Sequence, residues 1–188
     1  MDNIANQATL LYNNMKTNSN TVTTQILSLY DLTATKEALL DTYTPNQTIT
    51  YVTRVENTGS ASLYNLTVVD DLAKGLTQYV DNSVEGYLNG TPIEVNVQIT
   101  NNTVIFTIDN VINPNDNVLI IFETTTPTTR PDVLTNTQTI TANGGSTTGP
   151  IVAVTPNPSA TVTLANYVSL DITNQQIKLV FIVETHLF

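Results

Sequence analysis

The chain has 188 residues, 16 acidic and 6 basic, and a formal net charge of −10. This length allows one domain and part of another. The absence of Cys excludes a disulfide framework, a thiolate metal site and a thiol nucleophile, and the lone His186 argues against a Ser-His-Asp triad. The acidic balance argues against binding to nucleic acids, so we expect no enzyme, no cofactor and no nucleic-acid partner.

Threonine and asparagine dominate the composition. The chain contains 35 Thr and 23 Asn, which together make up nearly a third of its residues. Thr is β-branched and favours strands, whereas Asn favours turns that need a positive φ. No stretch has the roughly 18 apolar residues of a membrane span. The composition therefore predicts many strands joined by tight turns.

Alternating apolar and polar residues predict strands along most of the chain. In chain order, the predicted strands cover residues 47–56, 63–70, 95–99, 104–108, 118–124, 133–142 and 159–165. The strand at 118–124 is apolar on both faces, as expected in the centre of a sandwich. Turn sequences separate the strands at 56–60, Asn89-Gly90, Asn101-Asn102 and 113–116. Short strands with such frequent turns are typical of an antiparallel β-sandwich.

Two pairs of segments repeat at a spacing of about 130 residues. Residues 46–56 and 174–184 are identical at six of eleven positions, including the Ile, both Val and the final Glu. Residues 4–10 and 134–140 share the pattern apolar-x-Asn-x-x-Thr-apolar. We interpret the chain as one complete repeat with a partial repeat at each end.

This interpretation divides the chain into three parts. Residues 1–28 form a strand pair that resembles the end of a repeat, with strands expected at about 7–12 and 20–27. Residues 29–165 form the complete sandwich, and residues 166–188 form a strand extension that resembles the start of another repeat. A partial repeat cannot bury its own apolar face, so both ends require partners.

Apolar residues in the two terminal parts predict a subunit interface formed by strand exchange. These residues are Ala8, Leu10, Tyr12, Val22, Ile26, Ile177, Leu179, Val180, Phe181, Ile182 and Val183. In one arrangement, the two ends pair with each other or cover the sandwich of the same chain. In the other, one subunit's end pairs with the next subunit, and this head-to-tail contact generates a ring or an open filament.

A longer pattern runs through consecutive strands of the complete repeat. It comprises NQTITY at 46–51, VENTGSA at 55–61, LTVVDDL at 66–72, GL at 75–76, YVDNSV at 79–84 and NG at 89–90. This pattern resembles the bacterial surface repeat known as domain of unknown function eleven, and NQAT at 6–9 resembles its closing strands. The resemblance implies an immunoglobulin-like β-sandwich with a structural or adhesive role. The chain departs from the family pattern because it has one complete repeat and no visible wall-anchoring motif.

Lys36 and Asn136 are candidates for an isopeptide bond, which cross-links some sandwich domains of surface fibres. Lys36 lies in the first expected strand, and Asn136, or alternatively Asn143, lies near a late one. The candidates for the carboxylate that this reaction needs are Glu56, Asp70 and Asp71. In the alternative interpretation, Lys36 is a solvated charge and the Asn residues form turns.

Two further groups of residues have both a functional and a structural interpretation. Asp70 and Asp71, with Asp81, lack a calcium-loop pattern, so we expect solvated strand-end residues and no metal site. Tyr79 and Tyr87 are candidates for a sugar-binding face, but tyrosines in sandwiches commonly serve in packing.

The sequence therefore predicts a structural subunit of a bacterial surface filament that assembles head to tail through its terminal extensions. The alternative is a monomeric adhesive or carbohydrate-binding surface module. The expected partners are copies of the same chain and a surface anchor protein. We expect an extracellular location, on a cell or spore surface, although no signal peptide is visible at the N-terminus.

Overall fold

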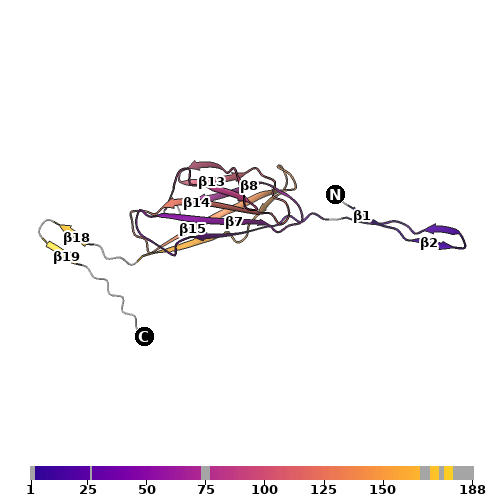
Figure 1. Ribbon diagram of the computed structural model, residues 1–188, viewed down its shortest axis with the longest axis horizontal. Helices are drawn as coiled ribbons and strands as arrows, with labels where there is room; N and C mark the ends of the chain where they lie inside the picture. The colour runs from indigo at the N-terminus through magenta and orange to yellow at the C-terminus, as the bar shows by residue number, and fades with distance from the viewer. Residues whose placement is uncertain (1–2, 26, 73–76, 166–169, 174–175, 180–188) are drawn as a thin grey trace, which may run out of the picture.

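β-strands account for all regular structure in the computed structural model, which describes residues 3–25, 27–72, 77–165, 170–173 and 176–179. Two sheets pack face to face in the central part of the chain (Figure 1). This arrangement confirms the predicted all-β, immunoglobulin-like antiparallel sandwich with extra terminal strands. The described residues form no helix of the length and apolar character needed to cross a membrane.

The first sheet has the strand order β11-β10-β14-β7-β5, with β9 paired to the end of β14. Its strands are β5 (Leu32–Ala38), β7 (Thr48–Asn57), β9 (Gln78–Tyr79), β10 (Glu85–Leu88), β11 (Thr91–Ile93) and β14 (Asn117–Thr125). All neighbours in this sheet are antiparallel. β14 lies at the centre, as its apolar sequence predicts, while β5 forms one edge.

The second sheet has the order β12-β13-β8-β15-β17-β6, with β16 paired to β15. Its strands are β6 (Thr42–Tyr43), β8 (Leu63–Asp71), β12 (Asn96–Thr100), β13 (Thr103–Ile108), β15 (Val133–Gly144), β16 (Ile151–Ala153) and β17 (Ser159–Leu164). Only the short pairing of β17 with β6 is parallel among the described strands. In both sheets, alternate residues face the core, where Tyr51, Phe106 and Phe122 pack together.

Asparagine supplies the turns that the composition predicts. Nine Asn residues in the described part of the chain have a positive φ. Asn89-Gly90 joins β10 to β11, and Asn101-Asn102 joins β12 to β13, as expected for two-residue hairpins.

The N-terminal extension forms one long hairpin. β1 (Asn3–Asn6) pairs with β4 (Val22–Gln25), and β2 (Thr9–Tyr12) pairs with β3 (Met15–Asn18). The strands expected at about 7–12 and 20–27 overlap β2 and β4, whereas β1 and β3 were not predicted. Asn13 and Asn14, both with positive φ, make the turn between β2 and β3.

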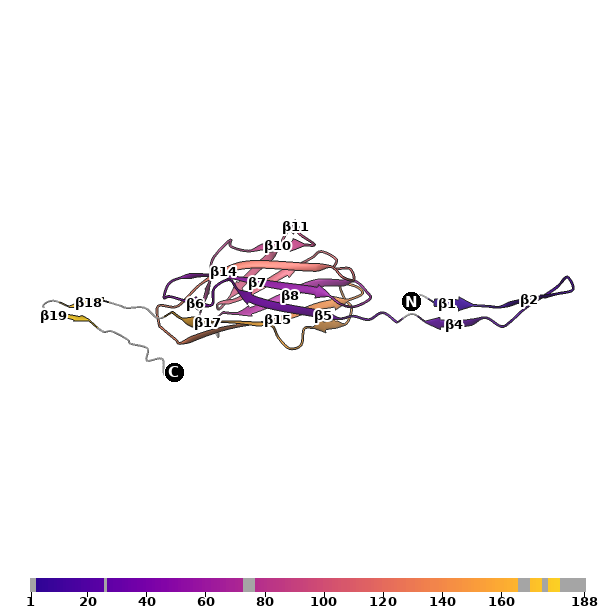
Figure 2. The same ribbon diagram turned by 60° about the horizontal axis from the view of Figure 1, so that its bottom comes forward.

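The C-terminal extension forms a shorter pair, β18 (Leu170–Thr173) with β19 (Gln176–Leu179). The two terminal pairs lie beyond opposite ends of the sandwich (Figures 1 and 2). Among the described residues, neither pair joins a sheet of the sandwich, and the two do not pair with each other. The arrangement in which the ends pair or cover the sandwich within one chain is therefore not the one in this structure.

Candidate functional site

Lys36 and Asp70 form an ion pair in the interior of the sandwich. Lys36 Nζ donates to Asp70 Oδ2 over 2.7 Å, and both side chains are 0% exposed. Lys36 belongs to β5 in the first sheet and Asp70 to β8 in the second, so the pair joins the two layers. Burying two opposite charges carries a desolvation cost that packed apolar residues do not have. The pair therefore points to a chemical role.

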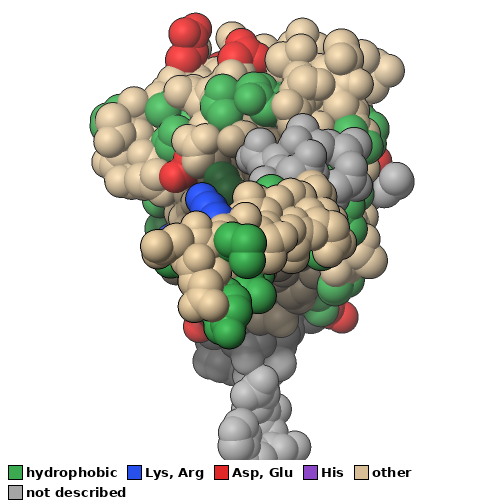
Figure 3. All heavy atoms as spheres, turned by 90° about the vertical axis from the view of Figure 1, so that its right-hand side faces the viewer, with side chains coloured by type: hydrophobic (Ala, Val, Ile, Leu, Met, Phe, Trp, Pro, Cys, Tyr) green, Lys and Arg blue, Asp and Glu red, His purple; other side chains and the backbone are tan. Residues whose placement is uncertain are grey.

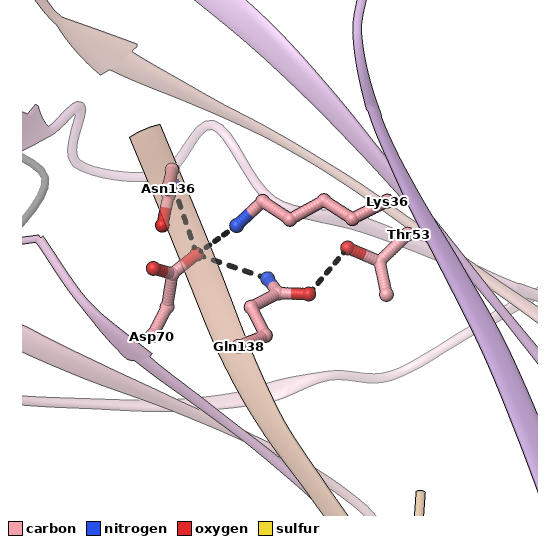
Figure 4. Close-up of polar contacts among 5 residues, drawn as sticks. All are labelled: Lys36, Thr53, Asp70, Asn136 and Gln138. Atoms are coloured by element: carbon pink, nitrogen blue, oxygen red, sulfur yellow. Dashed lines mark hydrogen bonds and ion pairs between the residues drawn. The ribbon is translucent and has the colours of Figure 1, made fainter. Parts of the chain in front are cut away.

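Strand alternation places Asn136 and Gln138 of β15 beside this pair. Both side chains are buried, and Gln138 lies directly opposite Asp70 in the β15–β8 ladder. Asn136 Nδ2 is 3.3 Å and Gln138 Nε2 is 2.9 Å from Asp70 Oδ2. Figure 4 shows that the Lys36 amine and these two amides all point to the same carboxylate oxygen.

Thr53 sets the orientation of the Gln138 amide. Thr53 is fully buried in β7, and its Oγ1 donates to Gln138 Oε1 over 2.7 Å. Because the amide oxygen accepts this hydrogen bond, the NH2 group of Gln138 faces Asp70. Thr53, Gln138 and Asp70 thus form a hydrogen-bonded chain that runs from one sheet to the other (Figure 4).

Two aromatic rings surround the amine of Lys36. Its Nζ lies 4.8 Å from the ring centre of Tyr51 and 5.2 Å from that of Phe122. Burial lowers the pKa of Lys36 to about 8, although the charge of Asp70 and its hydrogen bond oppose this effect. A lysine with this pKa loses its proton far more readily than a solvated one. The site therefore contains a larger fraction of neutral, nucleophilic amine than a solvated lysine has at the same pH.

Tyr51 and Asn136 are neighbours across the two layers. The pKa of the Tyr51 hydroxyl is raised to about 12, first by burial and then by the charge of Asp70, while the Asn136 amide offsets part of the rise. Tyr51 therefore keeps its proton at neutral pH, so the side chain next to the Lys36 amine is uncharged.

Three buried oxygen atoms of the site have no hydrogen-bond partner in the described part of the chain: Asp70 Oδ1, Asn136 Oδ1 and the Tyr51 hydroxyl. Buried polar atoms are nearly always paired, so this pattern needs a cause. A proton that moves from Lys36 to Asp70 turns one of these acceptors into a donor. The site then contains a neutral amine, a carboxylic acid and a carboxamide, which is the set of groups needed to exchange ammonia for lysine on the Asn136 side chain.

The structure brings Lys36 and Asn136 together at Asp70. It places Glu56, the carboxylate in the predicted set, on the outer face of β7, because Glu56 alternates with the inward-facing Thr53 and Val55. The carboxylate assignment is therefore corrected from Glu56 to Asp70. The expectation that Asp70 is solvated was also wrong, since it is 0% exposed.

The sequence patterns did not predict that Gln138 and Thr53 belong to the site. The signal for Gln138 was present, because Asn136 and Gln138 occupy inward positions of β15 between the buried Leu134 and Ile140. Two consecutive polar residues on the core face of a strand indicate a buried polar network. Thr53 gave no such signal, because threonine is common on both faces of these strands.

The predicted interface residues lie in the two terminal pairs. Ala8, Leu10, Tyr12 and Val22 are exposed in the N-terminal hairpin. Ile177 and Leu179 belong to β19. Ile26 and residues 180–183, which include Val180, Phe181, Ile182 and Val183, lie outside the described residues.

The two tyrosines considered for sugar binding face opposite sides of the first sheet. Tyr79 pairs with the inward-facing Thr124 and packs edge to face against Phe106 at 6.1 Å between ring centres. Tyr87 pairs with the outward-facing Leu119. They therefore do not form one binding surface. In the described residues, no three His, Cys, Asp or Glu side chains gather as a metal site.

No family model and no curated protein matches the chain. Several solved structures share its fold. The major pilin subunit BcpA of Bacillus cereus superposes with a TM-score of 0.56 at 12% identity, over 88% of this chain and 49% of that one. Domains D2 and D3 of the major pilin SpaD from Corynebacterium diphtheriae give 0.54 at 16% identity, over 68% and 51%. The collagen-binding subdomain of the Enterococcus faecalis surface protein ACE gives 0.50 at 9% identity, over 74% and 99%. The chain thus spans about half the length of the two pilin structures.

Proposed function

We propose that this chain is a structural, non-catalytic module of a bacterial surface pilus or adhesin, cross-linked internally by an isopeptide bond between Lys36 and Asn136. The observation that carries the proposal is the convergence of both side chains on Asp70 Oδ2 in the interior of the sandwich. The shared fold of the pilin and adhesin domains supports a location on a bacterial surface. The proposed location is the surface of a bacterial cell or of a spore.

The bond forms by transamidation, in which the Lys36 amine replaces ammonia on the Asn136 carboxamide. The neutral Lys36 Nζ attacks Cγ of Asn136, so that the Nζ–Cγ bond forms and the Cγ–Nδ2 bond breaks. Before the attack, Asp70 takes one proton from the Lys36 ammonium. It then gives this proton to Nδ2, which leaves as ammonia, and takes the second proton that Nζ loses on becoming the amide nitrogen. Asp70 is suited to this transfer because its Oδ2 contacts both nitrogen atoms.

The position of the bond suits a chain that carries tension. It ties β5, the first strand of the sandwich, to β15, which pairs with the last strand, β17. A pull between the two ends of the sandwich enters through these strands, so the bond prevents β5 from separating. In the chain-entropy description, closing a loop of about 100 residues stabilises the fold by roughly 4–5 kcal/mol.

We further propose that the terminal extensions join neighbouring subunits head to tail into a filament by strand complementation. The N-terminal hairpin supports this proposal because its large apolar side chains lie on an isolated pair of strands. Two-stranded hairpins are marginally stable in water, so a partner that covers this one stabilises it.

Two measurements on the purified chain test these proposals separately. Intact mass spectrometry tests the bond, with a mass lower by one ammonia expected for the unmodified chain and the full mass for Lys36→Met. Size-exclusion chromatography and negative-stain microscopy test assembly. A full-mass chain contradicts the cross-link, and a monomer at high concentration contradicts the filament.

A further inference from the structure

The N-terminal hairpin has two different faces. Between the pairs Asn6–Val22 and Ala8–Ser19, the second arm contains one more residue than the first, which is a β-bulge. The first arm therefore keeps its regular alternation from end to end. Its even-numbered side chains share one face with their partners on the second arm.

Almost all large apolar side chains of the hairpin lie on this even face. They are Ile4, Leu10, Tyr12, Met15 and Val22, and each is more than half exposed. The opposite face has Leu11 as its large apolar residue and otherwise carries small or polar side chains such as Ala5, Gln7, Thr9 and Lys16. Figure 3, which views the molecule from the hairpin end, shows hydrophobic side chains at the surface there. An exposed apolar face of this kind marks an interaction surface.

A face with the same residue pattern occurs inside the sandwich. By the internal repeat, residues 4–10 correspond to 134–140, so Ile4, Asn6 and Leu10 correspond to Leu134, Asn136 and Ile140. All three of the latter are buried and face the first sheet. Val22 pairs with Asn6 as Ala160 of β17 pairs with Asn136, and Ala160 is buried too. The hairpin thus presents the face with which β15 and β17 cover β5 and β7.

The C-terminal pair has the strand order and antiparallel direction of β5 and β7, although β5 pairs with residues 51–57 and not with the first residues of β7. Residues 174–184 repeat residues 46–56, so β19 corresponds to the first part of β7. β18 precedes β19 and pairs with it antiparallel, as β5 pairs with β7. One end of the chain therefore carries the closing strands of a sandwich, and the other end carries the opening strands.

We infer that the even face of the N-terminal hairpin of one copy packs on the β18–β19 pair of a second copy, as one layer of a sandwich on the other. The two pairs lie at opposite ends of the molecule (Figures 1 and 2), so the contact forms between copies. The charges permit this partner, because residues 3–25 contain Lys16 and no acidic residue, and residues 170–179 contain Asp171 and Lys178 and carry no net charge. The inference rests on the proposed head-to-tail assembly and specifies layer packing instead of strand addition at a sheet edge.

The repeat also predicts which residues meet. Asn136 and Tyr51 are neighbours across the layers of the sandwich. Their counterparts at the two ends are Asn6 and Leu179. Because the chain has no Cys, a disulfide between cysteines introduced at these two positions reports their contact without background.

The test is oxidative cross-linking of the full chain carrying Asn6→Cys and Leu179→Cys. We expect a ladder of covalent multimers on non-reducing gels, and dimers only when the two single variants are mixed. Ala5→Cys with Leu179→Cys is the matched control, because Ala5 lies on the other face of the hairpin. Asn6→Cys with Thr35→Cys probes addition at the exposed edge strand β5.

The outcomes separate this inference from the proposed assembly. Cross-linking of Asn6→Cys to Leu179→Cys at least tenfold above both controls supports layer packing. Filaments visible by microscopy without that preference overturn layer packing and leave head-to-tail assembly standing. A chain that remains monomeric before any substitution overturns both.

Discussion

Gln138 donates its side-chain N–H to Asp70 Oδ2 over 2.9 Å from the position directly opposite Asp70 in the β15–β8 ladder. The same oxygen accepts from Lys36, so Gln138 helps to hold the carboxylate while Oδ1 stays without a partner in the described residues. In the proposed reaction, this arrangement selects which oxygen contacts the amine. Gln138 is thus a positioning residue for the cross-link.

Replacing Gln138 by Met is expected to slow bond formation roughly ten- to hundredfold, the effect of losing one hydrogen bond to a charged group. The chain is refolded from denaturant, and the mass loss is followed with time. Thr53→Val is expected to slow the reaction less, because it only releases the Gln138 amide.

Thr124→Val is the matched control for Thr53→Val. Thr124 is equally buried, but its hydroxyl has no hydrogen-bond partner in the described residues. If Thr53→Val and Thr124→Val slow bond formation equally, the chain from Thr53 to Asp70 has no positioning role.

Replacing Asp70 by Asn is expected to abolish the mass loss. The side chain keeps its shape but can no longer move a proton between Lys36 and Asn136. It also leaves a buried amine without its counter-charge, which costs about 3–5 kcal/mol of unfolding free energy. Urea denaturation monitored by fluorescence measures this loss, and intact mass measures the bond.

Asp71→Asn is the control for Asp70→Asn. Asp71 adjoins Asp70 on β8, but it faces the outer side of the sheet because successive residues alternate. This variant is expected to lose ammonia at the rate of the unmodified chain. If Asp70→Asn cross-links as fast as Asp71→Asn, the carboxylate has been assigned wrongly.

The sequence was sufficient to predict the sandwich because its signals are local. The alternation in β7, β13 and β15 and the turns at Asn89-Gly90 and Asn101-Asn102 each depend on neighbouring residues only. The polar site was less predictable because it depends on register between distant strands. The pairing of Gln138 with Asp70 decides which carboxylate lies next to Lys36, and no local pattern contains that pairing.

The N-terminal hairpin shows the same limit in another form. The repeat predicted strands at about 7–12 and 20–27, which overlap β2 and β4, but it did not predict β1 and β3, which complete the hairpin. The face that carries Leu10 and Tyr12 follows from alternation alone, so it does not depend on the strands that were not predicted.

The proposed reaction predicts a specific pH dependence. Burial lowers the pKa of Lys36 to about 8, so below that pH the Lys36–Asp70 pair holds one proton to transfer. Above about pH 8 the amine loses this proton to solvent, and Asp70 has none to give to the leaving nitrogen. The rate of mass loss is therefore expected to be constant from pH 6 to 7.5 and to fall as the pH rises from 8 to 10. A rate that instead rises through pH 8 means that Asp70 acts only as a base.

The same pKa shift predicts how stability depends on pH when the bond cannot form. In Asn136→Ala, Lys36 keeps its amine, whose pKa is about 8 in the fold and 10.5 when solvated. Between these values the unfolded chain binds the extra proton, so unfolding free energy is expected to rise with pH from 8 to 10.5. The additional substitution Lys36→Met is expected to remove this rise, and urea titrations at each pH measure it.

Assembly through the N-terminal hairpin predicts that two neighbouring residues respond differently to the same substitution. Leu10→Asp places a charge on the apolar face, whereas Thr9→Asp places it on the opposite face. Losing the burial of one Leu side chain costs about 1.5–3 kcal/mol, so Leu10→Asp is expected to weaken self-association roughly ten- to hundredfold. Sedimentation velocity over a range of concentrations measures this change.

The sandwich reports whether either hairpin variant acts only on assembly. Neither Leu10 nor Thr9 belongs to its two sheets, so the mass loss at Lys36 and Asn136 is expected to remain complete in both variants. Equal weakening by Thr9→Asp and Leu10→Asp contradicts an interface confined to the even face, because Thr9 lies on the opposite face.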